Sequence, residues 1–361
     1  MLYKDYGKTG IKISAVGFGG MRFGAIDDHD KCVEMIVEAA KGGINYFDTA
    51  PLYFGTKSEE VTGKGLAELR RLKLPYYLAT KTMAFEEGAI RKEIEAQLKR
   101  LKVDYIDFYH IWCILSLDNW HLRKQNKIIE TFIKLKEEGL IKHICISSHL
   151  IGNDIKELLM EDVIEGVLFG YSASNFAFRD KAFEAIKKKK LGCVVMNPLG
   201  GGLIPDNPQI FDFIKTQNDE TVVEAALRFI FAHKDITTAL VGFGNLQHVK
   251  EAIKAAEGYK EISEATIESM KENIKTSFKD LCTGCQYCDH CPEGIKVPAL
   301  MDAYNHKKLY KKDQAILDRL YWHWNIPASE AAKCIECGKC EQECTQHLPI
   351  IKRMEEIAKL K

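Results

Sequence analysis

The stretch that decides the fold is residues 76–112, YYLATKTMAFEEGAIRKEIEAQLKRLKVDYIDFYHIW. An apolar run at Tyr76–Lys81 is followed by an amphipathic segment at Glu86–Leu101 and by a second apolar run at Ile106–Trp112. Short apolar runs on either side of a helix-period segment are typical of two parallel strands joined by a helix. This stretch therefore predicts a βαβ unit.

The same alternation continues from Ala15 to about residue 260. We predict strands at Ala15–Gly19, Tyr46–Thr49, Tyr76–Lys81, Ile106–Trp112, His143–Ser147, Gly166–Tyr171, Cys193–Asn197 and Thr238–Val241. We predict helices at Lys31–Lys41, Ser58–Arg70, Glu86–Leu101, Lys127–Glu138, Ile151–Met160, Lys181–Lys190, Thr221–His233 and Leu246–Glu257. Eight such units in about 250 residues indicate an α/β protein with a closed (β/α)8 TIM barrel over residues 1–260. Before them, Leu2–Ser14 predicts a hairpin that plugs the barrel bottom.

A doubly wound dinucleotide-binding sheet is the alternative architecture, because Gly17-Phe-Gly19-Gly20 follows a strand. Its fingerprint needs a third glycine, which would have to stand at Arg22. The pattern therefore favours the barrel.

A charged helix from Glu261 to Lys279 predicts a linking segment at residues 261–280, and residues 281–361 predict a smaller α-helical domain. Lys plus Arg and Asp plus Glu each number 51, so the charge balance indicates neither a nucleic acid nor a membrane partner. The N-terminal residues lack the apolar stretch of a signal peptide, and no run approaches the roughly 20 apolar residues of a membrane span. We therefore expect a cytoplasmic protein.

Eight of the 12 cysteines crowd into residues 282–344. They form two motifs, Cys282-Thr-Gly-Cys285-Gln-Tyr-Cys288-Asp-His-Cys291 and Cys334-Ile-Glu-Cys337-Gly-Lys-Cys340-Glu-Gln-Glu-Cys344. Three cysteines spaced by three residues wrap one [4Fe-4S] cubane, while the fourth reaches a neighbouring cluster. The motifs thus predict a ferredoxin-like domain with two clusters. One set of ligands would be Cys282, Cys285, Cys288 and Cys344, and the other Cys334, Cys337, Cys340 and Cys291.

Zinc is the competing metal, since paired cysteines also build tetrahedral zinc sites. A continuous run of three cysteines leaves the middle sulfur without a natural place in such a site, so the spacing favours iron-sulfur clusters. Two departures from ferredoxins stand out. Cys291 follows Cys288 after two residues rather than three, and Thr345 stands where ferredoxins carry proline. The remaining cysteines, Cys32, Cys113, Cys145 and Cys193, are scattered singly and are expected to pack as small apolar residues.

Asp48 and Lys81 end two predicted strands, and Tyr53 lies in the loop after Asp48. The carboxyl ends of barrel strands are where barrel active sites form. An ammonium group beside a phenol stabilises the phenolate, and a buried carboxylate keeps that ammonium charged. We therefore expect Tyr53, Lys81 and Asp48 to donate a proton to a carbonyl oxygen while hydride reaches its carbon.

Several motifs together resemble the aldo/keto reductases over essentially residues 1–260. They are Asp48-Thr-Ala-Pro-Leu-Tyr53-Phe-Gly55-x-x-Ser58-Glu59, Ala79-Thr-Lys81, Tyr105-Ile-Asp107-Phe-Tyr109, Ile146-Ser147-Ser-His149 and Pro198-Leu-Gly200-Gly-Gly202. The cysteine-rich region resembles the iron-sulfur extension of one branch of that family. The resemblance implies NADP or NAD across the barrel mouth. The residues it implies are Gly19, Gly20, Met21, Ser147, Ser148, Pro198, Leu199, Gly200, Gly201, Gly202, Gly242, Phe243, Asn245, His248 and Glu251.

One catalytic position departs from the family pattern, because the family's histidine should fall at position 112 and this chain has Trp112. His110 shares the inward face of the strand about 6.6 Å away, so it is a candidate substitute or a core histidine. His149 is the second candidate. His248 stands where a basic residue usually receives the 2′-phosphate, which leaves NADP and NAD open.

Two hypotheses for function follow. The first is an anaerobic oxidoreductase that moves hydride between NAD(P)H and a small carbonyl or alcohol, with Tyr53, Lys81, Asp48 and His110 as its catalytic set. Its clusters then serve structure or exchange electrons with a ferredoxin or another redox protein. The alternative is an electron-transfer protein whose barrel has lost nicotinamide chemistry and binds a flavin or another organic cofactor. Hydride carries two electrons and a cluster accepts one, and no splitting cofactor is evident in the sequence.

Overall fold

The computed structural model describes residues 1–26, 28–216, 219–277, 280–282, 284, 286–344 and 346–360. Contacts divide the chain into two compact units. The first contains Met1–Gly170, Lys181–Pro198 and Val223–Glu261, and the second contains Tyr171–Asp180, Leu199–Val222 and Ile262–Lys361. The second unit thus takes in two segments that follow barrel strands as well as the C-terminal region. The linear boundaries at residues 260 and 280 stay a prediction.

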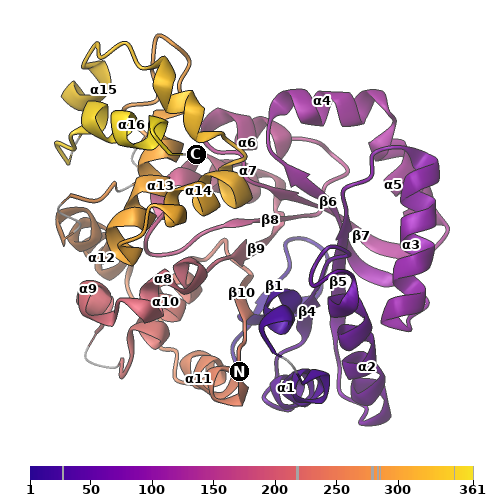
Figure 1. Ribbon diagram of the computed structural model, residues 1–361. Coiled ribbons are helices and arrows are strands. Elements are labelled where there is room, and N and C mark those ends of the chain that lie inside the picture. The colour runs from indigo at the N-terminus through magenta and orange to yellow at the C-terminus, as the bar shows by residue number, and fades with distance from the viewer. Residues whose placement is uncertain are drawn as a thin grey trace. The chain divides into compact units, whose positions relative to one another are not determined.

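Eight parallel strands close into a barrel in the first unit, as the sequence predicts (Figure 1). They are β3 (Val16–Gly19), β4 (Tyr46–Asp48), β5 (Tyr77–Thr82), β6 (Ile106–Ile114), β7 (Ile141–Ser148), β8 (Gly166–Gly170), β9 (Gly192–Met196) and β10 (Thr238–Gly242). Each strand pairs with the next along the chain, and β10 closes the ring by pairing with both β9 and β3.

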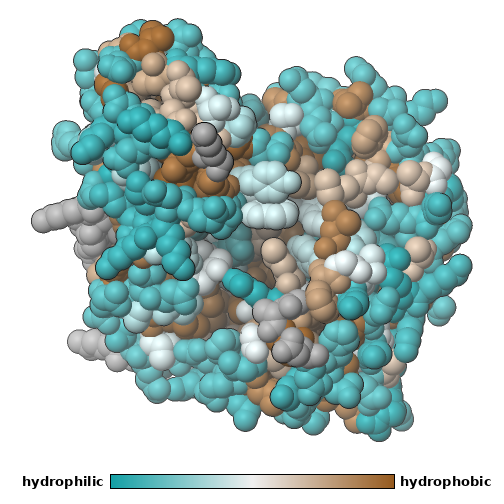
Figure 2. All heavy atoms as spheres, in the orientation of Figure 1, coloured by the Kyte–Doolittle hydropathy of each residue, from teal (hydrophilic) through white to brown (hydrophobic). Residues whose placement is uncertain are grey.

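Helices alternate with these strands. They are α1 (His29–Lys41), α2 (Lys57–Arg71), α3 (Glu87–Leu101), α4 (Leu117–Gln125), α5 (Ile128–Glu137), α6 (Gly152–Leu158), α7 (Asp180–Lys189), α10 (Val222–Phe231) and α11 (Leu246–Glu257). The surface over α3, α4 and α5 is largely hydrophilic, with apolar residues only in small patches (Figure 2). Each predicted barrel strand and helix begins and ends within two residues of the observed element. The helix α4 was not predicted, because its residues LDNWHLRKQ are mostly polar.

An N-terminal hairpin precedes the barrel, formed by β1 (Tyr3–Asp5) and the antiparallel β2 (Lys12–Ser14). It places Tyr6 in the core, where the Tyr6 and Phe108 rings lie 4.3 Å apart between centroids. A Cβ atom at Gly166 would lie 2.0 Å from Tyr6 Oη, and one at Gly192 would lie 2.1 Å from Tyr6 Cε1. Both strands therefore need glycine where Tyr6 enters.

The second unit is helical, as predicted for the C-terminal region. Its helices are η2 (Phe176–Arg179), η3 (Gly200–Gly202), α8 (Leu203–Asp206), α9 (Pro208–Phe211), η4 (Asp212–Ile214), α12 (Glu264–Ser277), α13 (Val297–Tyr310), α14 (Gln314–Arg319), the π-helix η5 (Leu320–Trp324), η6 (Ala328–Lys333), α15 (Lys339–Gln342) and α16 (Ile350–Ala358). Buried Asp302 of α13 accepts hydrogen bonds from Arg319 Nε and Trp324 Nε1, both at 2.7 Å. This carboxylate ties three consecutive helices together. No helix in the described ranges combines the length and apolar character needed to cross a membrane.

The close fit of Tyr6 yields a prediction. Gly192→Ala drives a methyl group into the Tyr6 ring, so it should lower the free energy of unfolding by about 1–3 kcal/mol. In a Tyr6→Leu background the same substitution should cost less, because the ring is gone. Urea unfolding of the four proteins measures both effects. Gly88→Ala is the control, since nothing lies within 4 Å of the added Cβ. An equal cost of Gly192→Ala in both backgrounds would contradict the account.

Candidate active site and iron-sulfur motifs

The carboxyl ends of neighbouring strands bring the predicted site residues together. In the strand register, Gly242 of β10 pairs with Gly19 of β3, which pairs with Asp48 of β4. Lys81 and His110 are register partners on β5 and β6. This rim is the face where barrel enzymes bind their ligands.

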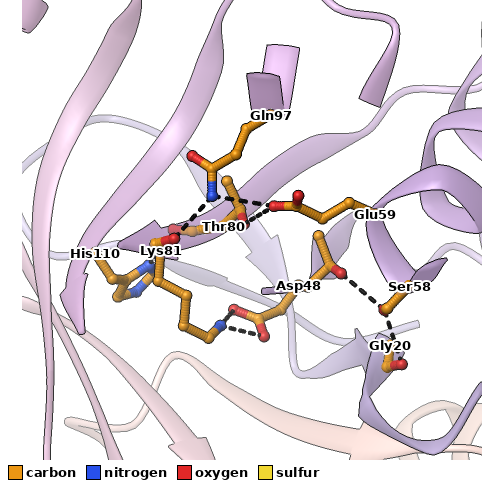
Figure 3. Close-up of polar contacts among 9 residues, drawn as sticks. Gly20, Asp48, Ser58, Glu59, Thr80, Lys81, Gln97 and His110 are labelled. Carbon is orange, nitrogen blue, oxygen red and sulfur yellow. Dashed lines mark hydrogen bonds and ion pairs between the residues drawn. The ribbon is translucent and has the colours of Figure 1, made fainter. Parts of the chain in front are cut away.

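Asp48 and Lys81 form a buried ion pair. Lys81 Nζ lies 2.6 Å from each carboxylate oxygen of Asp48, and both side chains are 1% exposed (Figure 3). Burial raises the pKa of Asp48 and lowers the pKa of Lys81, and in each case the charge of the partner opposes the shift. Two buried opposite charges in this geometry stabilise each other and hold the lysine side chain at one position.

Tyr53 lies beside this pair. Lys81 Nζ is 5.6 Å from the centroid of the Tyr53 ring, and the Trp112 ring meets the Tyr53 ring edge-on at 5.7 Å. Burial raises the pKa of Tyr53 above its ordinary value, and the Asp48 carboxylate raises it further. Lys81 Nζ is bound to Asp48, and the raised pKa of Tyr53 keeps the phenol protonated. A protonated phenol is the form that donates a proton.

His110 is fully buried next to Lys81. Its Nδ1 lies 3.3 Å from the Thr80 carbonyl oxygen, and its Nε2 has no hydrogen-bond partner among the described residues. Burial, with the nearby Lys81 charge, lowers the pKa of His110 to about 3. The imidazole is therefore neutral. The second candidate, His149, follows β7, and its backbone N–H donates to the Ile114 carbonyl.

A polar network behind Lys81 was not predicted. Buried Glu59 accepts hydrogen bonds from Thr80 Oγ1 at 2.8 Å, Gln97 Nε2 at 3.1 Å and Arg100 Nε at 2.7 Å. Gln97 Nε2 also donates to the Lys81 carbonyl at 2.9 Å (Figure 3). The network fixes the backbone that carries Lys81. Glu59 stood in a quoted motif, but nothing in the sequence indicated that its partners lie 21 and 38 positions away.

A second chain of hydrogen bonds fixes the start of the 3-10 helix η1 (Gly20–Ala25), which follows β3. Thr49 Oγ1 lies 2.8 Å from Ser58 Oγ, which donates to the Gly20 carbonyl at 3.0 Å (Figure 3). A Cβ atom at Gly20 would lie 2.7 Å from Ser58 Oγ, so this contact requires glycine. The next residue, Met21, is 66% exposed. The predicted cofactor residues Gly20 and Met21 therefore begin η1, whose first residue is held by Ser58.

Ser147 and Ser148 end β7, and their hydroxyl groups differ. Ser148 Oγ donates to the Ile114 carbonyl at 3.0 Å and accepts from the Leu150 N–H at 3.0 Å. In the described part of the chain, the Ser147 hydroxyl makes no side-chain hydrogen bond. The Ser148 hydroxyl thus holds the strand end in place, and the Ser147 hydroxyl does not take part in this.

The predicted cofactor residues after β10 form the entry to α11. A Cβ atom at Gly242 would lie 2.7 Å from Arg22 Cγ, so Arg22 packs on this glycine. Phe243 is buried against Phe18, with ring centroids 5.0 Å apart. Asn245 caps α11 by accepting from the His248 N–H at 3.0 Å.

His248 is held near this helix start, since its Nδ1 lies 3.4 Å from the Gly244 nitrogen and its Nε2 lies 3.3 Å from Asn245 Nδ2. Glu251 follows one turn later on α11.

The predicted cofactor residues after β9 are divided between the two units. Pro198 belongs to the first unit, whereas Leu199, Gly200, Gly201 and Gly202 belong to the second. Each of these three glycines has positive φ, which favours glycine.

The cysteines of the two motifs differ in exposure. Cys282, Cys288 and Cys344 are buried, Cys291, Cys334 and Cys340 are intermediate, and Cys337 is exposed. Cys285 and Thr345 lie outside the described residues. The buried cysteines belong to one of the two predicted ligand sets and the more exposed cysteines to the other.

Backbone N–H groups point at two of the buried sulfurs. The Gly284 N–H donates to Cys282 Sγ at 3.4 Å, and the Leu348 N–H donates to Cys344 Sγ at 3.5 Å. Asn305 holds the Cys282 backbone on both sides, with two hydrogen bonds of 2.8 Å. Such N–H donors stabilise thiolates and suit cluster ligands.

In the second motif, burial and the neighbouring Cys334 raise the pKa of Cys340 to about 11. Within the described ranges, no three Cys, His, Asp or Glu side chains are gathered as a metal-binding group. The donor types and the N–H groups nevertheless fit iron-sulfur clusters. The scattered cysteines differ, because Cys32, Cys145 and Cys193 pack in the core with raised pKa values.

Known proteins share both parts of the chain. Residues 15–275 match the aldo/keto reductase family, and residues 281–348 match a 4Fe-4S dicluster domain. L-galactose dehydrogenase of Arabidopsis thaliana is 32% identical over 283 residues, covering 69% of this chain and 86% of that protein. The uncharacterized oxidoreductase YqkF of Bacillus subtilis is 26% identical, covering 76% and 97%. The holo form of aldo-keto reductase AKR11C1 from Bacillus halodurans superimposes with a TM-score of 0.66 at 26% identity, covering 76% of this chain and 96% of that one.

The fold, the residues at the strand ends and these relatives define an oxidoreductase enzyme built on a (β/α)8 barrel. The chain belongs to the aldo/keto reductase family and carries a C-terminal 4Fe-4S domain.

The cysteine sets yield a prediction. Anaerobically isolated protein should contain about eight iron and eight sulfide per chain, and Cys334→Ala should retain about half of each. Cys193→Ala, in the barrel core, is the matched control and should keep its full content of iron and sulfide. Iron and sulfide analysis with absorption spectra measures the outcome. Zinc without sulfide, or iron loss in Cys193→Ala, would contradict the assignment.

Proposed function

We propose that the protein transfers hydride between NAD(P)H and a small carbonyl or alcohol, with Tyr53 as the proton donor and acceptor. The buried Asp48–Lys81 ion pair beside Tyr53, with Lys81 Nζ bonded at 2.6 Å to both carboxylate oxygens, carries this proposal. It is a costly arrangement to bury, and it lies on the barrel face where ligands bind.

In this proposal Tyr53 donates its phenolic proton to the carbonyl oxygen as the carbonyl carbon is reduced. Its raised pKa keeps it protonated, and Lys81 stabilises the negative charge that develops when the proton leaves. Asp48 holds the lysine in place. The Glu59 network supports the strand beneath, so the lysine needs little reorganisation during the reaction.

The bound dinucleotide supplies the hydride. The fit of the chain to this cofactor rests on the available Ser147 hydroxyl, the glycine loop at Gly20 and the capped start of α11. We propose that Gly19, Gly20, Met21, Ser147, Ser148, Pro198, Leu199, Gly200, Gly201, Gly202, Gly242, Phe243, Asn245, His248 and Glu251 hold NADP or NAD. Ser148 would act mainly by fixing the strand end, since its hydroxyl is already bonded twice.

His110 serves here as a positioning residue rather than as a substrate contact. Its Nε2 is buried, it is neutral, and it is the register partner of Lys81. Its ring lies beside Lys81 on the neighbouring strand and would limit the directions that the lysine side chain can take (Figure 3).

We propose that the 4Fe-4S domain carries two clusters, one held by Cys282, Cys285, Cys288 and Cys344 and the other by Cys334, Cys337, Cys340 and Cys291. The second set is the more exposed, which supports exchange of single electrons with a redox-protein partner such as a ferredoxin. This exchange is separate from hydride transfer. The anaerobic, cytoplasmic setting stays a prediction.

One observation favours the alternative, an electron-transfer protein without nicotinamide chemistry. Trp112 stands at the position of the family histidine, and its ring meets the Tyr53 ring at 5.7 Å. An indole in this place removes a polar group that the family uses near the carbonyl. A flavin or another organic cofactor would then occupy the barrel.

Substitution of Tyr53 distinguishes between the two proposed functions, hydride transfer and electron transfer without nicotinamide chemistry. Tyr53→Phe should lower the rate of benzaldehyde reduction with NADPH or NADH by about 10²-fold or more, because the proton donor is lost. The measurement is the oxidation rate of the reduced nicotinamide under anaerobic conditions, with iron content as a check on the clusters. Tyr105→Phe is the matched control, since Tyr105 is 44% exposed and makes a surface contact with Lys142. Equal rates for the native protein and Tyr53→Phe would overturn the proposal.

A further inference from the structure

An arginine near the barrel mouth is buried without an acidic partner. Arg123 of α4 is 3% exposed, and its Nε donates to Asn119 Oδ1 at 2.9 Å. Its Nη1 is buried and has no hydrogen-bond partner among the described residues. No carboxylate in the described part of the chain forms an ion pair with this guanidinium. Burying a charge without a partner is costly, so the arrangement suits the binding of an anion.

The position of Arg123 connects it to the active site. The helix α4 begins directly after β6, the strand that carries His110 and Trp112. Between them, the register with β7 shifts between Ile111 and Ile114, and Cys113 takes φ of 61°, which a residue with a side chain rarely adopts. This irregular strand end includes Trp112, whose ring meets the Tyr53 ring.

Cys113 follows Trp112 directly in the chain and lies near the end of β6, just before α4. The thiol raises the pKa of the Tyr53 phenol, and the Arg123 guanidinium opposes the raised pKa that burial gives to Cys113. These electrostatic contributions agree with the chain connection that runs from Trp112, whose ring contacts Tyr53, through Cys113 to α4 and Arg123.

We propose that Arg123 binds the carboxylate of a negatively charged carbonyl substrate whose carbonyl oxygen lies at Tyr53. This inference rests on the proposed function and names its substrate class. The planar guanidinium matches a carboxylate, and Nε is already fixed by Asn119 so that the terminal nitrogens are oriented. A single arginine with one anchored nitrogen suits a monoanionic carboxylate better than a phosphate, which usually draws several donors.

The test compares benzaldehyde with 3-carboxybenzaldehyde and 4-carboxybenzaldehyde, which differ only by the anionic group. The native protein should reduce at least one carboxylated aldehyde with the higher kcat/KM. In Arg123→Gln this preference over benzaldehyde should fall by about tenfold or more, mainly through KM, because a charge-assisted hydrogen bond is lost. Arg123→Lys keeps the charge without the planar fork and should retain part of the preference.

Controls separate the possible failures. Arg91→Gln removes an arginine that is paired on the surface with Glu87 and Glu138, so it should leave the preference unchanged. Circular dichroism and iron content check that each variant folds. If Arg123→Gln does not fold, Arg123→Lys takes its place in the comparison of aldehydes. Native protein that reduces benzaldehyde but shows no Arg123-dependent preference would overturn this inference alone. Native protein that reduces none of the aldehydes would overturn the proposed function and this inference with it.

Discussion

The buried ion pair between Asp48 and Lys81 is the constraint on which the candidate site depends. Two opposite charges at 2.6 Å inside a protein are stable only when each keeps its partner, and removing one typically costs about 3–5 kcal/mol. The two residues come from different strands, so the pair exists only when β4 and β5 are in register. The pairing of these two strands in the barrel thereby places the Lys81 ammonium group beside Tyr53.

Rigid packing on the two sides of the pair keeps that geometry. At the barrel bottom, Tyr6 fills the space that Gly166 and Gly192 leave open. At the top, Glu59 and Gln97 hold the backbone of Lys81 through side-chain hydrogen bonds. The site is therefore organised before any ligand binds, which is what electrostatic stabilisation of a developing charge requires.

Sequence patterns predicted the barrel because alternating apolar runs and helical periods are local features, as in residues 76–112. The same patterns could not give distances between residues far apart, such as Thr80 and Gln97 around Glu59. The direction of the Tyr53 pKa shift could not be read from the sequence, because it depends on burial and on the nearby Asp48 carboxylate. The helix α4 was not predicted, because its sequence is mostly polar. Arg123 on this helix did not stand out in the sequence, because only the folded structure shows that it is buried.

The most direct test of the account follows a labelled hydride. Native protein is incubated anaerobically with benzaldehyde and NADPH or NADH. In the reduced nicotinamide, deuterium replaces both hydrogens on the ring carbon that gives up the hydride. Mass spectrometry then measures deuterium in the alcohol product. We predict one deuterium on the alcohol carbon for each nicotinamide oxidised, at a rate that depends on Tyr53. Nicotinamide oxidation that reduces the clusters without forming deuterated alcohol, or no oxidation at all, would contradict it.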